Sequence, residues 1–527
     1  MLDDFLKGKL KMKKRLVALS LSLALLVSFC GCSGKKTASE YTEYESVVDS
    51  TGLSDNSQSG GSKTESGSKT ESGSGGTGST GGGTTSVPKY TKPNKPSTSA
   101  TDTSGHKVEL ANPVYIANGT KAMDEGLNFG GKTFTMAKRS DENYTQGRFS
   151  RLVAAFEKKY NCKIKASELD FDSYVTLVTN AKASGTPYDI IFGHGAMFPS
   201  LPMGGVLNDL SEYFTTADYD TGKGGVDIAK SSYFVMDGKL YGVVGGEDAV
   251  SPEVIYYNKV LFKKSGLEDP YELYKAGKWT WSKFREQGKK VTDSANKVYY
   301  GDADFFRLST VHSLGMPIVT WKNNSAVLNL QETKVVKGFQ LMYDLFNSSK
   351  ICSPYFNSTR HSHFSDGLSY CTTEEMQKYP EVCGIAAQSP AFNRSADNVG
   401  IVPFPQDTAS AKAGYPCGWY SAVMSGAGSS DPRVAIAFAK FWSTYNDPVS
   451  DKYELNSEYK QLRKKLISGN IINTHGSYTG SDGSNAISLL NYNIAMDIAK
   501  GQDVTSSINM YLPKIKADID YVLSKKK

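Results

Sequence analysis

KTFTMAK (132–138) alternates apolar and polar residues, which is typical of a β-strand with one buried face. It is followed by apolar residues at helical spacing (149–160) and then by a second alternating stretch, KIKASEL (163–169). Another helical pattern (174–181) leads to YDIIFG (188–193), an apolar strand that ends in glycine. This alternation of strands and helices predicts a parallel sheet in an α/β fold.

The carboxyl end of the third strand is the first place where a ligand is expected. Ligands of open α/β sheets bind beyond the carboxyl ends of the strands, which places residues 193–195, including His194, near a cleft. GLNFGGKT (126–133) matches a nucleotide-binding phosphate loop, but that loop needs a strand before it and a helix after it. Here a strand follows, so we expect a glycine turn and no nucleotide cofactor.

The N-terminus reads as an export signal. The uncharged run LVALSLSLALLVSF (16–29) follows a basic cluster and is too short to span a bilayer. The stretch SFCGCSGKK (28–36) resembles a bacterial lipobox, with cleavage after Gly31 and lipid attached to Cys32. The alternative is an ordinary cleaved signal without lipid. Translation starts at Met1 or at Met12, which opens a more usual signal.

Composition divides the rest of the chain into a tether and a folded part. Residues 32–110 are rich in Gly, Ser and Thr and poor in large aliphatic residues, so we expect a disordered tether. The formal net charge is +6, but residues 1–31 carry six basic and two acidic residues, which leaves about +2 for the mature chain. A nucleic-acid partner is therefore not expected.

Five cysteines lie in the folded part, and their pairing is open. They are Cys162, Cys352, Cys371, Cys383 and Cys417. A Cys371–Cys383 disulfide is the first to test, and buried free thiols are the alternative. His361 and His363 form an isolated H-x-H pattern, so we expect no metal site.

Several motifs then resemble one family in their order. KLYGVV (239–244), EVIYYNKVLFKKSGLEDP (253–270), KWTWSKF (278–284), GIVPFPQD (400–407) and DPRVAIAFAKFWSTY (431–445) are similar to landmarks of extracellular solute-binding protein family 1. This is the carbohydrate-binding group of ABC transporter substrate-binding lipoproteins that contains maltose-binding protein. The resemblance covers residues 130–527.

The resemblance implies a two-lobed, periplasmic-binding-protein-like (type II) α/β fold with a hinge. Lobe one would hold residues 130–250 and 398–445, and lobe two residues 255–395 and 450–527. It also implies a monomeric receptor that captures a saccharide by lobe closure and delivers it to an ABC permease, and the saccharide we expect is an oligosaccharide. With the lipobox, the expected location is the extracytoplasmic face of the cell membrane of a Gram-positive bacterium, anchored by lipid.

Sugar capture needs aromatic faces for pyranose rings and polar groups for hydroxyls. The resemblance and this chemistry together select nine candidate ligand-binding residues: His194, Phe198, Glu247, Asp248, Tyr256, Trp321, Phe392, Trp419 and Tyr420. For Trp419 the alternative is packing at the hinge, and for Trp321 it is packing at the surface. For Glu247 and Asp248 the alternative to ligand binding is a solvated loop. Tyr256 and Tyr257 must face opposite sides of a strand, so at most one lines the cleft.

Two other functions stay open. A receptor for a non-sugar solute such as a peptide would share this fold, and a secreted carbohydrate-degrading enzyme would also need an aromatic cleft. The sequence has no G-x-S-x-G and no H-E-x-x-H motif, and adjacent carboxylates such as Glu247 and Asp248 do not suit glycoside hydrolysis. We therefore expect no catalytic residues, no cofactor and no enzymatic activity.

Overall fold

A computed structural model describes residues 93–101, 107–118, 126–140, 147–171, 173–215, 218, 226–246, 249–356, 361–407, 416–449, 452–468, 471–472, 478–482 and 484–526. Residues 82–527 belong to one compact unit. The expected signal peptide, Met12 and Cys32 lie outside the described residues. Among the helices that are described, none is long and apolar enough to cross a membrane.

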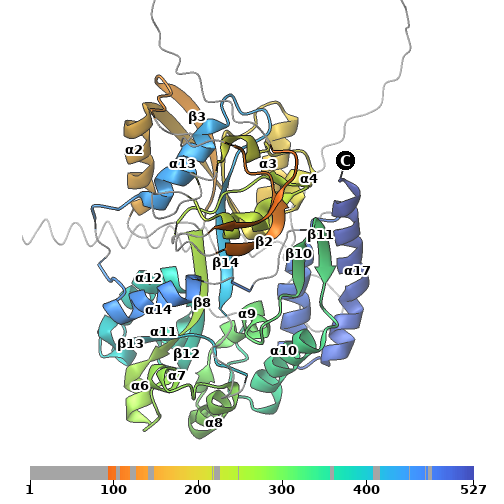
Figure 1. Cartoon of the computed structure of the whole chain (residues 1–527). Helices are drawn as coiled ribbons and strands as arrows, with labels where there is room; N and C mark the ends of the chain where they lie inside the picture. Colours follow the sequence, from red (N-terminus) through yellow and green to blue (C-terminus); the bar gives the residue numbers. More distant parts are fainter. Residues whose placement is uncertain are drawn as a thin grey trace, which may run out of the picture. The chain divides into compact units, whose positions relative to one another are not determined.

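A mixed sheet of eight strands forms the centre of the fold (Figure 1). In spatial order its strands are β4 (Cys162–Leu169), β3 (Lys132–Arg139), β5 (Ile190–His194), β14 (Cys417–Met424), β8 (Val250–Asn258), β12 (Ser369–Glu375) and β9 (Tyr299–Gly301), with β13 (Val399–Val402) also paired to β8. Three short antiparallel pairs lie outside this sheet: β1 (Ser97–Thr101) with β2 (Lys107–Val114), β6 (Val235–Met236) with β7 (Lys239–Leu240), and β10 (Val319–Lys322) with β11 (Ser325–Leu328).

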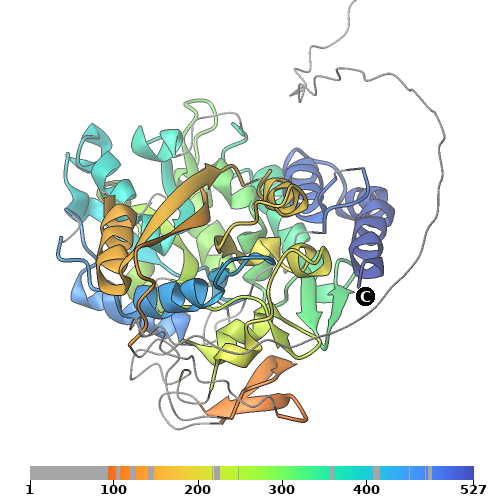
Figure 2. The ribbon, with the colours of Figure 1, turned by 90° about the horizontal axis from the view of Figure 1, so that it is seen from above.

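The first three strands confirm the predicted parallel α/β arrangement. β3 pairs in parallel with both β4 and β5, and the helices α2 (Arg148–Tyr160) and α3 (Tyr174–Ala183) make the connections. α2 buries the apolar stripe that its spacing predicts. It lies beside α13 (Arg433–Thr444), almost 300 residues further along the chain, as Figures 1 and 2 show, and the rings of Phe156 and Phe438 are 5.2 Å apart.

Two long strands join the two halves of the sheet. The first half of β14 pairs with β8 and its second half pairs with β5, while the rest of β8 pairs with β12 and β13. All nine residues of β8 are buried. Gly418 has φ of 150°, and a Cβ atom there would lie 2.0 Å from the carbonyl oxygen of Ser251, so only glycine fits where these strands meet.

Short helices surround the half of the sheet that contains β8, β12 and β9. Thr280 caps α8 (Trp281–Val291) through its side chain, and Trp279 and Trp281 on either side of it are buried and fasten the start of the helix. Trp442 is buried in α13 and belongs to the core. The remaining α-helices are α4 (Ser200–Met203), α5 (Ile228–Ser231), α6 (Lys259–Lys264), α7 (Pro270–Lys275), α8 (Trp281–Val291), α9 (Leu308–His312), α10 (Thr333–Tyr343), α11 (Ser362–Ser365), α12 (Tyr379–Ala386), α14 (Ser457–Ile467), α15 (Ala486–Ser488), α16 (Met496–Ala499) and α17 (Val504–Ser524).

The expected tether is wrong at its C-terminal end, because β1 and the start of β2 lie within residues 32–110. The two strands pair antiparallel with each other. β2 is also fixed to the fold: the backbone N–H of Ala111 donates to Ser232 Oγ (2.8 Å), and Asn112 Nδ2 donates to the Ser232 carbonyl (3.0 Å). This segment has few large apolar side chains. Backbone pairing and the buried Asn112 amide hold it in place instead.

The structure shows the form of the glycine-rich stretch before β3 and the state of the five cysteines. Gly130 and Gly131 have positive φ of 63° and 81° and lead directly into β3 at Lys132, so the apparent phosphate loop is the expected glycine turn. The five cysteines of the folded part are all free and buried, which is the alternative to a Cys371–Cys383 disulfide.

Candidate ligand-binding site

One face of the central sheet gathers polar and aromatic side chains where β5, β14 and β8 meet. His194 is paired with Ser421 across β5 and β14, and Trp419 is paired with Ser251 across β14 and β8. Directly paired residues project to the same face of a sheet, and so do alternate residues along one strand. Glu253, which pairs with both Cys417 and Glu375, therefore shares this face.

Trp419 is held from two sides on this face. Its indole N–H donates a hydrogen bond of 3.1 Å to Glu253 Oε1, and its ring centroid lies 4.6 Å from that of His194 at an interplanar angle of 45°. The side chain is only partly buried, in contrast to the full burial of Tyr420 beside it. Trp419 can therefore offer ring surface to a ligand without first breaking its own contacts.

His194 is a neutral hydrogen-bond donor. Its Nδ1 atom accepts from the backbone N–H of Ala196 at 3.1 Å, so the proton of the neutral ring resides on Nε2. Burial, together with the nearby Arg139 guanidinium, lowers the pKa of His194 well below its usual value. The ring of Phe171, which is 37% exposed, packs edge-on against His194 at 5.7 Å and lies under the guanidinium of Arg139 at 5.0 Å.

Glu253 is a buried carboxyl group with partners in several elements. Besides Trp419, it accepts a hydrogen bond from the hydroxyl of Ser309 in α9. Burial is the main reason that the pKa of Glu253 rises to about 7; the Arg307 guanidinium opposes this rise, and Glu375 and Glu374 add to it. Near neutral pH this group is divided between its protonated and ionised forms.

A charged network borders Glu253. Arg307 Nη2 lies 3.3 Å from Asp304 Oδ1, and Arg307 Nη1 lies 3.8 Å from Glu374 Oε1. Burial favours the neutral form of Arg307, but the carboxylates of Asp304, Glu374 and Glu253 outweigh it and raise its pKa. The charges of this network are thus largely paired within the protein.

His361 belongs to the same network. Its Nε2 atom lies 3.0 Å from Glu374 Oε2, and its Nδ1 atom lies 3.4 Å from Asp304 Oδ2. Asp302, Asp304 and His361 place possible metal-ligand atoms within 4.8 Å of one another. Asp304 also contacts Arg307, and His361 also contacts Glu374 and Thr372, so these two side chains already have partners within the protein.

A narrow cavity of about 20 Å³ is lined in part by Phe171 and Ala196, which both contact His194. Two separate parts of the sequence line it, one from 171 to 197 and the other from 485 to 488. The first part supplies Phe171, Val175, Ala196 and Met197, and the second supplies Asn485, Ile487 and Ser488. The polar face of the sheet therefore lies beside a narrow groove between two chain segments, 171–197 and 485–488, that the sequence assigns to different lobes. We call this groove the crease.

Of the nine candidate residues, the structure brings two pairs into contact: His194 with Trp419 on the polar face, and Phe198 with Trp321 in the core. The Phe198 ring packs against Trp321 at 5.7 Å, and the indole N–H of Trp321 donates to the Val235 carbonyl at 3.0 Å. Both side chains are buried, so surface packing, the alternative for Trp321, is wrong. Glu247 and Asp248 lie outside the described residues.

Three other candidates are fully buried and already engaged. The hydroxyl of Tyr256 donates to the carbonyl of Glu375 at 3.0 Å, and that of Tyr420 accepts from the backbone N–H of Ile471 at 2.8 Å. Phe392 packs edge-on against Phe364 at 5.0 Å. These three side chains present no surface to a ligand in this structure.

Sequence reasoning missed the groups that surround Trp419. Phe171, Arg139 and Arg307 carry no motif, and they reach the site only through the packing of separate elements. Glu253 did leave a signal, because it is the one charged residue in the strand VSPEVIYYN (250–258). A charged residue inside a buried strand indicates a paired or functional group.

Comparisons with known proteins identify the family and the fold. A model of the family described as "Bacterial extracellular solute-binding protein" matches residues 151–447. No curated protein matches the chain.

Solved structures show the fold. An ABC substrate-binding protein from Listeria monocytogenes in complex with cycloalternan has a TM-score of 0.56 and 17% identity, over 74% of this chain and 100% of that one. The galacto-N-biose/lacto-N-biose I-binding protein of Bifidobacterium longum gives 0.54 and 17%, over 75% and 99%. A Staphylococcus aureus extracellular solute-binding protein in complex with maltose gives 0.53 and 14%, over 74% and 98%.

These likenesses confirm the expected two-lobed, periplasmic-binding-protein-like α/β fold. The family match covers more than half of the chain and includes β5, β8 and β14, which carry the polar face. The resemblance found in the sequence motifs is therefore confirmed. The chain belongs to the family of bacterial extracellular solute-binding proteins.

Proposed function

We propose that this protein captures a saccharide in the crease beside Trp419 and delivers it to the permease of an ABC transporter. The observation that carries the proposal is the partly exposed indole of Trp419, held by Glu253 and His194 on a polar face of the sheet. An aromatic ring packs against the apolar C–H face of a pyranose, while fixed donors and acceptors bind its hydroxyl groups. His194 Nε2 and the Ser421 hydroxyl lie on the same face and suit that role.

The ligands of the similar structures support a saccharide as the ligand of this protein. Cycloalternan, lacto-N-biose and maltose are the compounds bound in the three structures described above. They differ in their sugar units, so they support a saccharide, and an oligosaccharide in particular, without selecting one. The similar proteins are binding proteins, which is consistent with capture without chemistry.

The proposed lobes take their bounds from the family resemblance. Lobe one comprises residues 130–250 and 398–445, and lobe two comprises residues 255–395 and 450–527. One strand departs from them: β13, which these bounds place in lobe one, pairs with residues 255–258 of β8, on the lobe-two side of the sheet. β8 and β14 run between the two lobes as the strands of the hinge, since β8 pairs with both β14 and β12, and β14 continues the sheet to β5. A bend in these two strands would close the crease over a bound sugar.

The proposed location is the extracytoplasmic face of the cell membrane of a Gram-positive bacterium. The lipobox-like SFCGCSGKK (28–36) supports lipid attachment at Cys32, and the following Gly/Ser/Thr-rich segment supports a tether that holds a monomeric receptor away from the membrane. Mass spectrometry of the mature N-terminus tests the anchor. An unmodified, internal Cys32 would remove it.

Calorimetric titration against a panel of oligosaccharides tests the function. The panel includes maltotriose, cellotriose, xylotriose and lactose, with a tripeptide mixture as the test of the peptide alternative. We expect saturable binding of at least one saccharide and intact sugar recovered afterwards. Released shorter sugars would instead support the degradative enzyme, and binding of peptides alone would support the other receptor class.

A further inference from the structure

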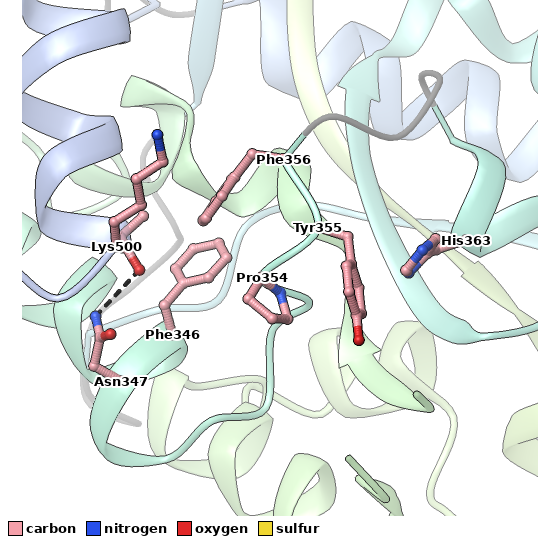
Figure 3. A pocket seen from close by; sticks show the side chains of 8 residues that line it. Phe346, Asn347, Pro354, Tyr355, Phe356, His363 and Lys500 are labelled. Carbon is pink, nitrogen blue, oxygen red and sulfur yellow. Dashed lines mark hydrogen bonds between the residues drawn. The ribbon is translucent and has the colours of Figure 1, made fainter. Parts of the chain in front are cut away.

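A pocket of about 620 Å³ lies away from the crease (Figure 3). Its volume is within the range of small-molecule sites in proteins. Its lining residues are Phe346, Asn347, Pro354, Tyr355, Phe356, His363, Ala499 and Lys500. All of them come from segments assigned to lobe two, and none lies on the polar face around Trp419.

The aromatic rings of this pocket are held in place by contacts with neighbouring rings. Phe346 and Phe356 lie 5.4 Å apart, and Phe356 also packs at right angles to Phe306 at 5.9 Å. Tyr355 lies 5.1 Å from the ring of His363. A ring surface that neighbours already fix costs a ligand little conformational entropy to bind.

Tyr355 exposes an unusually large part of its side chain. It is 37% exposed, whereas Phe346 is only 6% exposed. Figure 3 shows Tyr355 and His363 toward one end of the pocket and Asn347 and Lys500 toward the other. The pocket therefore offers aromatic surface in its middle and polar groups at both ends.

The polar groups differ in charge from those of the crease. The imidazole of His363 lies with Nδ1 3.1 Å from Ser353 Oγ, and burial lowers its pKa, so the ring is neutral near pH 7 and Nε2 is left for another partner. Lys500 is exposed at the rim. The eight lining residues include no carboxylate, in contrast to Glu253 and Glu375 on the polar face around Trp419.

We infer that this pocket is a second saccharide site, which takes one pyranose ring of a neutral or anionic sugar against Tyr355 and Phe356. Aromatic faces would cover the C–H surface of the ring, and His363 Nε2 and Lys500 Nζ would bind its oxygens. A cationic amino sugar is disfavoured, because Lys500 lines the pocket and the Lys297 ammonium lies 5.6 Å from the centre of the Tyr355 ring. The inference rests on the proposed function to the extent that saccharides are the class of ligand.

Saturation-transfer NMR on the full-length protein tests the pocket, since it detects weak binding. Maltotriose, cellotriose, xylotriose and lactose are the probes, each with wild type, Trp419→Ala, Tyr355→Ala and the double variant. We expect at least one sugar to keep part of its signal in Trp419→Ala. In the double variant that remaining signal should fall about tenfold.

Two further variants control for folding and position. Lys500→Ala changes an exposed side chain, and in the Trp419→Ala background it should weaken the remaining signal about threefold. Tyr492→Ala removes a tyrosine that is 63% exposed and does not line the pocket, and it should leave that signal unchanged. Circular dichroism confirms that each variant is folded.

The outcomes separate this inference from the proposed function. If Trp419→Ala removes all binding and Tyr355→Ala changes none, the pocket is not a site, and the crease stands. If Tyr355→Ala removes all binding and Trp419→Ala changes none, the pocket stands, and the proposed site at Trp419 falls. Sugars that bind neither variant nor wild type would overturn both.

Discussion

At the scale of single residues, Trp419 gives the sharpest test of the crease. Trp419→Ala removes the ring that is held by Glu253 and His194, and we expect saccharide affinity to fall about 30-fold, or about 2 kcal/mol. Trp419→Phe keeps a ring but loses the N–H bond to Glu253, so a smaller loss is expected. Calorimetry measures both. Affinity of Trp419→Ala within twofold of wild type would mean that Trp419 only packs at the hinge.

Glu253 predicts a pH dependence of stability. Its pKa is raised from 4.5 to about 7 by burial, so the folded protein holds this proton more tightly than the unfolded chain. The free energy of unfolding therefore contains a favourable contribution from this proton, which is complete below about pH 4.5 and is lost as the pH rises through about 7. The total loss is about 3 kcal/mol at most. Glu253→Gln cannot ionise but can still accept from Trp419.

The difference between wild type and Glu253→Gln is therefore the quantity to measure. Denaturant unfolding at about pH 5 and about pH 8 should show the variant gaining stability relative to wild type at the higher pH. Taking the difference removes the contribution of other titrating groups such as Asp302. An equal difference at both pH values would show that Glu253 ionises normally in the folded state.

Residue by residue, the sequence predicted side chains with a local motif better than side chains that meet through packing. Trp419 and His194 were selected because one follows a family landmark and the other ends an apolar strand. Glu253 and Phe171 were missed, because their closeness to Trp419 depends on strand register and on which way a loop folds. Phe392 was selected by position in a motif, which does not reveal that its side chain is buried.

At the scale of elements, the β8–β14 pair depends on Gly418. Its φ of 150° favours glycine, and a Cβ atom there would meet the Ser251 carbonyl at 2.0 Å. We expect Gly418→Ala to destabilise the protein by at least about 2 kcal/mol, measured as a shift in denaturant midpoint. Gly384→Ala is the matched control in α12, where a Cβ atom meets nothing closer than 3.9 Å and should be neutral or stabilising. Equal stability of the two variants would contradict this view of the strand crossing.

The β1–β2 pair gives a second prediction for an element. Asn112 is fully buried; its Nδ2 donates to the Ser232 carbonyl, and its Oδ1 accepts from the backbone N–H of Asn324 at 3.3 Å. Asn112→Ala leaves both backbone groups without this partner, so we expect a loss of about 1–3 kcal/mol in unfolding free energy. Lys107→Ala, at an exposed position of the same strand, should have no effect. If Asn112→Ala also leaves the unfolding free energy unchanged, β2 is not part of the cooperative fold.

Elements with clear periodicity were predicted well, and elements that depend on distant partners were not. β3, α2, β4, α3 and β5 follow the pattern of apolar residues because each buries one face locally. β2 did not stand out, since its contacts with Ser232 and Asn324 are more than 100 residues away. Its segment has the composition of a tether, and pairing with the fold outweighs that composition.

For the molecule as a whole, the arrangement of β8 and β14 links the site to the hinge. Trp419 and Glu253 lie on these two strands and are hydrogen-bonded to each other. In the proposed mechanism, a ligand at Trp419 would contact a side chain of the strands that bend when the lobes close. A ligand that contacts both lobes stabilises the closed arrangement by its difference in affinity for the two states.

Distance measurements by electron spin resonance test this closure. Spin labels at Lys158→Cys in α2 and Lys289→Cys in α8 lie on exposed positions of lobes one and two, and the native cysteines of the folded part are buried. We expect a saccharide that binds in calorimetry to shift this distance to shorter values, because it favours the closed state. A pair within lobe one, Lys158→Cys with Lys165→Cys, should not change, and Trp419→Ala should abolish the shift at the same sugar concentration. A saturating sugar that leaves the interlobe distance unchanged would show that capture proceeds without closure, and β8 and β14 would then be rigid supports of the site.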